Sequence, residues 1–302
     1  MTEGSRKAII AAFVANLGIA ISKFVAFAIT GSAGLLAESV HSLADTGNQG
    51  LLFLGGRRAR HEPTTEHPFG FGRERYFWAF VVSVVLFTLG GAFAIYEGVD
   101  KLRHPHKPES LGWAVGVLVA AVVMETLSFR TAIKEANHTR GGQPWARFIR
   151  RSKAPELPVV LLEDFGALIG LMFALVGVVL ANATGNARFD ALGSLAIGIL
   201  LCAIAIVLAI EMKSLLIGES AGPHVQATIA QAMESHPRVH RLIHMRTQHL
   251  APDELLVAAK VAFDSTLSFE ELARTIDDVE RAVRERVPEA QFIYVEPDCF
   301  RE

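Results

Sequence analysis

The chain has 302 residues, of which 51% are hydrophobic and 20% are charged. Its mean hydropathy is +0.34, whereas soluble domains typically contain about 45–50% apolar and about 25% charged residues. The net charge of −2 argues against nucleic-acid binding, which usually needs a basic face. The two cysteines, Cys202 and Cys299, form no plausible pair, which excludes a disulfide-built secreted scaffold. The composition therefore indicates an integral membrane protein.

Six apolar runs, each long enough to cross a bilayer, precede residue 213. A spanning helix needs about 20 mostly apolar residues. We predict spans at about 8–30, 35–56, 76–99, 112–133, 157–181 and 190–212. The segments before the first span, after the second and after the fourth hold 13 Lys and Arg, against 4 in the alternate loops. Because basic loops tend to stay on the cytoplasmic side, both termini are predicted to be cytoplasmic.

The first run has no cleavage site of the kind that ends a signal peptide, and we expect no transit peptide. We therefore interpret it as a retained span. The predicted organisation is an α-helical transmembrane domain of six helices over residues 1–212 and a cytoplasmic domain over residues 213–302.

The pattern changes at residue 213, and residues 213–302 hold 25 of the 60 charged residues of the chain. Helical and alternating periodicities follow one another there in the order α-β-β-α-β. Ser268 and Glu271 have the spacing of a capping box, which marks the start of a helix. We predict helices at 223–235 and 268–286 and strands near 239–249, 254–264 and 291–296. The C-terminal region is thus expected to be an α+β domain.

Ionisable residues in the second and fifth runs are the best candidates for chemistry, because such groups are costly inside a membrane and usually functional. His41 and Asp45 are four residues apart, so they lie on one face of a helix. Glu163 and Asp164 are adjacent and cannot both face the same way. Imidazole nitrogen with carboxylate oxygen suits Zn²⁺, and also Mn²⁺, Co²⁺ or Fe²⁺. The sequence therefore predicts an intramembrane site for a divalent cation.

The same residues also have purely structural interpretations. His41 and Asp45 can hydrogen-bond across a helix interface, and one of the two carboxylates at 163 and 164 can serve as a partner for Lys23 in the first run. Glu125, in the middle of the fourth run, fits either a proton relay or a contact between helices.

Two stretches, Gly31–Asp45 and His67–Tyr76, resemble the cation diffusion facilitator family of divalent-metal exporters. The resemblance covers nearly the whole chain, and the stretches that begin at Leu161 and Asp190 are similar to its zinc transporter 9 branch. It implies six spans, cytoplasmic termini and an α-β-β-α-β domain. It also implies a homodimer that moves Zn²⁺ or a related ion out of the cytosol in exchange for H⁺.

By this resemblance, spans two and five hold the transported ion. Three positions match family ligands: His41, Asp45 and Asp164. The family commonly has His or Asp one turn before the last of these, but this chain has Val160. The fourth ligand is therefore open among a carboxylate, two amides and water: Glu163, Asn16, Asn48 or a water molecule.

Several histidines in the C-terminal region raise the possibility of a regulatory metal site: His236, His240, His244 and His249. Lys260 and Val295 stand where the family has bridging ligands. This departure favours the alternative, an exposed and solvated histidine-rich edge.

We expect a Zn²⁺/H⁺ antiporter that works by alternating access, with Zn²⁺ as its transported ion. The expected location is a bacterial cytoplasmic membrane, with an organelle membrane as the alternative. The alternatives are an exporter of Mn²⁺, Fe²⁺ or Co²⁺ and a membrane-anchored metal sensor or interaction protein. An intramembrane hydrolase is disfavoured, because the chain has no HExxH motif.

Overall fold

The computed structural model describes residues 3–30, 33–104 and 111–299, and the side chains of 33–41, among others, lie outside that description. The chain divides into two compact units. The first, here called the bundle unit, comprises Met1–His61 and Glu74–Lys213, and the second, the C-terminal unit, comprises Glu62–Arg73 and Ser214–Glu302. The segment Glu62–Arg73, which lies between two predicted spans in the sequence, thus groups with the C-terminal unit.

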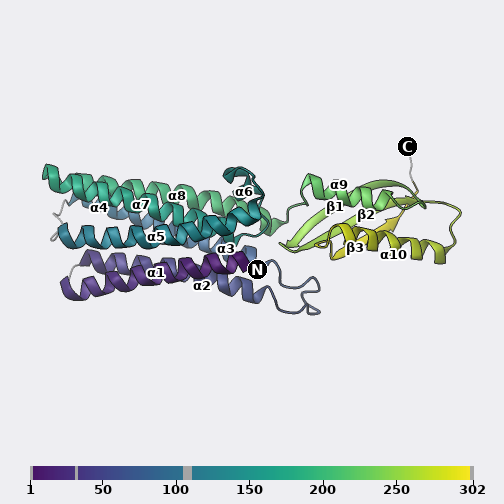
Figure 1. Cartoon of the computed structure of the whole chain (residues 1–302), viewed down its shortest axis with the longest axis horizontal. Helices are drawn as coiled ribbons and strands as arrows, with labels where there is room; N and C mark the ends of the chain where they lie inside the picture. The colour runs from purple at the N-terminus through teal and green to yellow at the C-terminus, as the bar shows by residue number, and fades with distance from the viewer. Residues whose placement is uncertain (1–2, 31–32, 105–110, 300–302) are drawn as a thin grey trace. The chain divides into compact units, whose positions relative to one another are not determined.

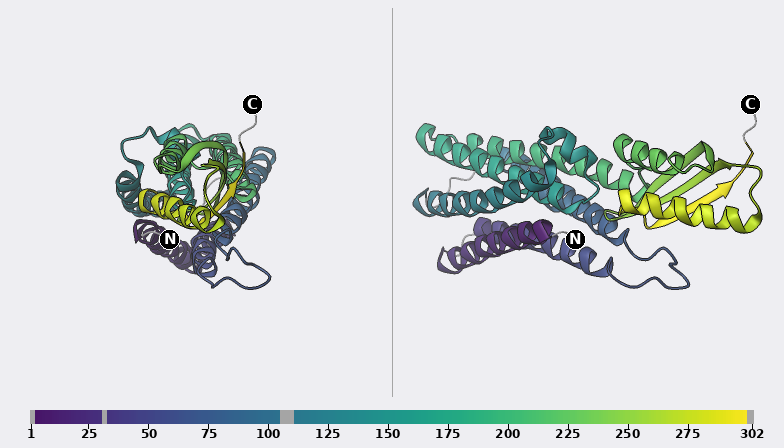
Figure 2. Two further views of the ribbon diagram at one scale, coloured as in Figure 1. Left: turned by 90° about the vertical axis from the view of Figure 1, so that its right-hand side faces the viewer. Right: turned by 45° about the vertical axis from the view of Figure 1, so that its right-hand side comes forward.

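Long helices form the bundle unit (Figure 1). They are α1 (Glu3–Thr30), α2 (Ala33–Arg58), α3 (Glu74–Val85), α4 (Phe93–Arg103), α5 (Leu111–Arg140), α7 (Glu156–Thr184) and α8 (Arg188–Ile217). The basic segment before α7 contains a shorter helix, α6 (Trp145–Arg151). The long helices run alongside one another (Figure 2), with α1 packed against α2 and α5, and α5 packed against α7.

Five segments of the described chain are long and apolar enough to cross a membrane, including Glu74–Arg103, which joins α3 to α4. The side chains of helix α2 are described over residues 42–58, and this stretch is shorter than the 18 residues that the criterion requires. It carries polar side chains such as Asp45, Asn48 and Gln49. Five of the predicted spans therefore have a counterpart by this criterion. The sixth span and the orientation of the bundle stay predictions.

The helix from Glu74 to Arg103 contains a π-helical segment, η1 (Leu86–Ala92). Glycine is required near its end: a Cβ atom on Gly91 would lie 2.5 Å from Sγ of Cys202 in α8. Farther along the same helix, a Cβ atom on Gly98 would lie 2.7 Å from Leu195. The two glycines allow this helix to approach α8 more closely than any residue with a side chain would permit.

The C-terminal unit has the predicted α-β-β-α-β order, which is confirmed. Its elements are α9 (Pro223–Glu234), β1 (Val239–Ala251), β2 (Glu254–Phe263), α10 (Phe269–Arg286) and β3 (Phe292–Pro297). The strand order is β1-β2-β3. Strands β1 and β2 pair antiparallel, as a short hairpin connection requires, whereas β2 and β3 pair parallel across the α10 crossover.

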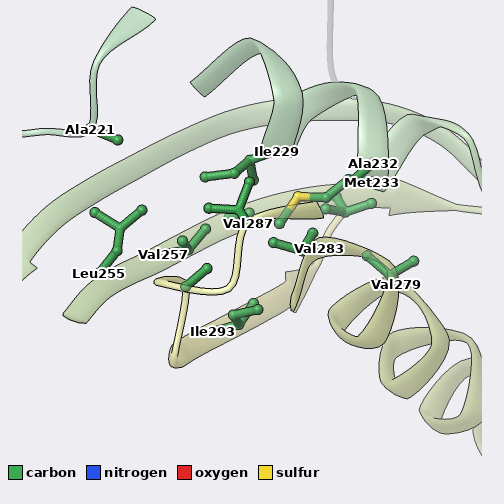
Figure 3. Packing of buried hydrophobic residues seen from close by; sticks show 13 residues of the cluster. Ala221, Ile229, Ala232, Met233, Leu255, Val257, Val279, Val283, Val287 and Ile293 are labelled. Carbon is green, nitrogen blue, oxygen red and sulfur yellow. The ribbon is translucent and has the colours of Figure 1, made fainter. Parts of the chain in front are cut away.

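Alternation along β2 builds the core of this unit. Every second residue from Leu255 to Val261 is buried, as expected for a strand with one covered face. Val279 and Val283 of α10 pack onto that face together with Ile229 of α9 (Figure 3). The capping box is present, since the Ser268 hydroxyl accepts the backbone N–H of Glu271 and the Glu271 carboxylate accepts the backbone N–H of Ser268.

Candidate functional site

A cavity of about 280 Å³ lies inside the bundle unit. Helices α1, α2, α4, α5, α7 and α8 contribute to its wall, which is apolar for most of its extent. The charged and polar side chains along the cavity are Asn16, Lys23, Ser42, Asp45, Glu97, Lys101, Glu125, Glu163, Asp164, Asp190 and Ser194. Such a concentration of carboxylates among apolar helices is the kind of site that binds or conducts cations.

Asp164 is buried and faces α5. The hydroxyl of Ser128 donates a hydrogen bond of 2.7 Å to Oδ2 of Asp164, and this bond fixes the orientation of the carboxylate. The residue one turn earlier, Val160, is fully buried and has no donor or acceptor atom in its side chain. Asp164, a predicted ligand, therefore lies at the cavity wall, and Val160 supplies no ligand at the preceding turn.

Glu163 points to a different helix. Both of its carboxylate oxygens accept hydrogen bonds from α2, one from the Asn48 amide at 2.9 Å and one from the Gln49 amide at 2.8 Å. Asn16 of α1 in turn donates to the side-chain oxygen of Gln49 at 3.3 Å. The adjacent carboxylates thus bond to two different helices, α2 and α5, and the prediction that Glu163 and Asp164 face different ways is confirmed.

Asp45 and Glu125 bring two more carboxylates to the same cavity. Glu125 is buried and is repelled by Asp164 and Asp45, while the ammonium group of Lys23 attracts it. Lys23 also donates a hydrogen bond of 2.9 Å to the hydroxyl of Ser42. A cluster of buried carboxylates of this kind favours occupation of the cavity by cations or protons.

His41 belongs to α2 by its backbone, but its side chain lies outside the described part of the chain. Among the described residues, no group of three or more His, Cys, Asp or Glu is arranged to hold a metal ion. The predicted set of His41, Asp45 and Asp164 is thus untested as a cluster and stays a prediction.

A second polar group lies toward the C-terminal end of α7, which is the end opposite Glu156. The ammonium of Lys101 is 3.0 Å from Oε1 of Glu97 and 3.2 Å from Oδ2 of Asp190, and it donates to Ser194 at 3.2 Å. These residues also line the cavity. The cavity therefore extends along the bundle from Asp164 to this ion-paired group.

The opposite end of α7 is tied to α3 by a buried ion pair. The guanidinium of Arg75 donates to both oxygens of Glu156, at 2.6 and 2.9 Å. The side chains of the pair are 4% and 2% exposed. Two parallel charge-assisted bonds of this kind are strong and geometrically specific, so the pair fixes α3 and α7 to each other at this end of the bundle.

Sequence reasoning missed three of these partners: Ser128, Gln49 and Glu156. Each is a polar residue in or beside an apolar run, which is a signal that could have marked it as buried and bonded. The identity of its partner, however, depends on the rotation of two helices about their axes, which the sequence does not define.

The cation efflux transmembrane domain model matches residues 9–217, and the model for the cytoplasmic domain of cation efflux proteins matches residues 222–298. The chain belongs to the cation efflux family. The predicted family is therefore confirmed.

Three relatives illustrate the range of this cation efflux family. The mouse protein "Proton-coupled zinc antiporter SLC30A9, mitochondrial" is 33% identical over 87% of this chain and 47% of its own length. "Metal tolerance protein C4" of Arabidopsis thaliana is 28% identical over 88% of this chain and 58% of its own. "Magnetosome protein MamB" of Paramagnetospirillum magneticum is 24% identical over 93% and 90%, respectively. This chain thus spans about half of the length of the SLC30A9 relatives.

The C-terminal unit of this cation efflux chain places its histidines in different surroundings. His240 and His244 are exposed, whereas His249 is buried. Lys260 lies opposite His244 in the sheet and forms ion pairs with Glu296 at 3.0 Å and Asp298 at 3.2 Å. Hydrogen bonds to these two carboxylates raise the pKa of Lys260. Glu296 and Asp298 are thus engaged in ion pairs with the ammonium group of Lys260.

Proposed function

We propose that the chain exports a divalent cation, Zn²⁺ first, in exchange for H⁺ by alternating access. The observation that carries the proposal is the set of three carboxylates, Asp45, Glu125 and Asp164, along one cavity between apolar helices. The similarity to relatives named proton-coupled zinc antiporters supports both the ion and the counter-ion.

The proposed ligands are His41, Asp45 and Asp164. Imidazole and carboxylate groups must lose their protons before they bind a metal. Protons entering from the side of lower pH therefore compete for the same atoms and release the ion there. Glu163 is a weaker candidate for the fourth ligand, because amide groups already occupy both of its oxygens.

The proposed topology has six spans, including α2, with both termini and the C-terminal unit in the cytoplasm. We place the protein in a bacterial cytoplasmic membrane, and the MamB similarity over 90% of that protein's length supports this location. The model that matches residues 222–298 is named ZT_dimer, which supports a homodimer.

The second candidate function is export of Mn²⁺, Fe²⁺ or Co²⁺. It is favoured by the donor atoms of the described cavity, which are carboxylate and amide oxygens, because oxygen ligands suit Mn²⁺ better than soft ligands do. The third candidate is a membrane-anchored metal sensor. The carboxylates inside the bundle argue against it, because helices that only anchor a protein do not require buried charged groups.

The test is metal flux into proteoliposomes that contain a pH-sensitive dye, with Zn²⁺, Mn²⁺, Co²⁺ and Fe²⁺ compared. For Asp45→Ala we expect a Zn²⁺ flux at least about 100-fold below that of the wild type, since even outer-shell changes at metal sites cost about 10–100-fold. The matched control is Asp100→Ala, an exposed carboxylate in the same bundle, which should leave flux unchanged. Flux of Mn²⁺ alone would select the second candidate, and no flux of any ion would select the sensor.

A further inference from the structure

The carboxylate of Glu163 dictates how two neighbouring amides of α2 are turned. An ionised carboxylate only accepts hydrogen bonds, whereas an amide side chain has a donating NH₂ and an accepting oxygen. Asn48 and Gln49 direct their NH₂ groups to Glu163, at 2.9 and 2.8 Å. The carbonyl oxygen of each amide is thereby turned away from Glu163.

These two carbonyl oxygens have different surroundings. The oxygen of Gln49 accepts a hydrogen bond from Asn16. The oxygen of Asn48 is buried, in a residue only 1% exposed, and has no hydrogen-bond partner within the described residues. A buried carbonyl oxygen without a partner is uncommon and calls for an explanation, such as an ion that binds there.

The position of Asn48 on α2 points to the transported cation. Asn48 follows Asp45 by three residues and His41 by seven, so all three positions share one face of the helix. Its hydrogen bond to Glu163 also places it beside α7 at the residue adjacent to Asp164. Asn48 is thus bonded directly to Glu163, a residue that lines the cavity together with Asp45 and Asp164.

We propose that Asn48 supplies its side-chain oxygen as a ligand of the transported cation and that Glu163 is the positioning residue that holds the amide in this orientation. The inference rests on the proposed function and names a ligand of the same site. Two carboxylates, Asp45 and Asp164, with a neutral amide then balance the charge of a divalent cation. Glu163 takes no direct part in binding.

The test uses the full-length chain with Co²⁺ as the probe, because the visible absorption of bound Co²⁺ depends on its ligands and geometry. We expect Asn48→Ala to change the Co²⁺ spectrum and to raise the KM for Co²⁺ flux by about 10–100-fold, the range seen when metal-site partners are removed. Glu163→Gln, which no longer forces the amide to one orientation, should raise KM in the same direction but less.

The matched control is Gln49→Ala, which removes the other amide bond to Glu163 and retains the proposed ligand. A purely structural role predicts the same result for Asn48→Ala and Gln49→Ala. Our proposal predicts that Gln49→Ala keeps the wild-type Co²⁺ spectrum and raises KM less than Asn48→Ala does.

An exchange of the two groups gives a second test that does not depend on a destabilised variant. In Asn48→Asp with Glu163→Gln the total charge is unchanged, the new amide can donate to the new carboxylate, and an oxygen at position 48 remains for the ion. We expect this double variant to have a lower KM for Co²⁺ than Glu163→Gln alone and an altered Co²⁺ spectrum.

A wild-type Co²⁺ spectrum in folded Asn48→Ala would overturn the proposal, and so would an unaltered spectrum in the double variant. Wild-type protein is measured first. If it neither binds nor transports any of the four metals, then the proposed function fails, an outcome distinct from failure of Asn48 as a ligand.

Discussion

The two units of the chain distribute polar and apolar residues in opposite ways. In the C-terminal unit, Leu255, Val257 and Val283 are buried, while charged residues such as Glu285 are exposed. In the bundle unit, large apolar residues such as Val123 are exposed. Inside a membrane the hydrophobic effect no longer separates core from surface, so the buried polar residues identify the interior of the bundle.

The largest effect on stability is expected from breaking the buried ion pair of the bundle unit. Arg75→Met leaves the carboxylate of Glu156 buried without its partner and should lower the free energy of unfolding by about 3–5 kcal/mol. Thermal or denaturant unfolding of the full-length protein in detergent measures this change.

The control for this prediction replaces both partners. Arg75→Met combined with Glu156→Leu removes the unpaired charge and should recover most of the lost stability, since apolar replacements of buried ion pairs are often neutral or stabilising. If Arg75→Met alone costs no more than Val123→Ala, an exposed apolar position, then the proposed contrast between the two units is wrong.

In the C-terminal unit the sensitive positions are apolar. Leu255→Ala removes a fully buried side chain of β2 and should cost about 2–5 kcal/mol, from lost burial and the cavity left behind. Hydrogen exchange of the β1 and β2 amides in the full-length protein reports this loss locally. Glu285→Ala, an exposed change in α10, is the control and should stay within about 0.5 kcal/mol of the wild type.

The smallest effect concerns pH and the start of α10. Hydrogen bonds from the backbone and hydroxyl of Ser268, together with Arg238, lower the pKa of Glu271. A carboxyl group with a lowered pKa in the folded state stabilises that state above its unfolded pKa, and this contribution is lost as the pH falls through the folded pKa. Protection of α10 amides should therefore decrease below about pH 4, the unperturbed range of glutamate.

The comparison variant is Glu271→Gln, in which this part of the pH dependence should be absent. Ser268→Ala should destabilise α10 by about 1 kcal/mol at neutral pH, as is typical for the loss of a helix cap. Equal acid sensitivity of wild type and Glu271→Gln would show that the cap does not depend on the charge of Glu271.

The C-terminal unit could be predicted from the sequence in more detail than the bundle unit. The reason is the contrast described above in how the two units distribute polar and apolar residues. In the C-terminal unit one face of each element is buried and the other contacts water, so apolar residues recur with a period of two along β2 and with a helical period along α10. Both elements were predicted to within about two residues. The capping box at Ser268 fixed the start of α10 by local chemistry alone.

In the bundle unit the predicted runs are helices, but their contacts did not follow from the sequence. Asp45, Glu163 and Asp164 stood out because charge is rare in apolar runs. The bonds from Ser128 to Asp164 and from Gln49 to Glu163 depend on how residues far apart in the chain are brought together. Whether Asp45 and Asp164 share one metal ion with His41 stays a prediction.

The π-helical segment η1 has a consequence for the residues that follow it. A π turn accommodates about one extra residue relative to an α-helix, and one residue corresponds to a rotation of about 100°. Glu97 and Lys101, which line the cavity, therefore owe their direction to a change of phase several residues earlier. If all seven residues of Leu86–Ala92 wound as regular α-helix, these charges would turn onto a different face, whereas a one-residue deletion in this segment would restore α-helical winding and keep them facing the cavity.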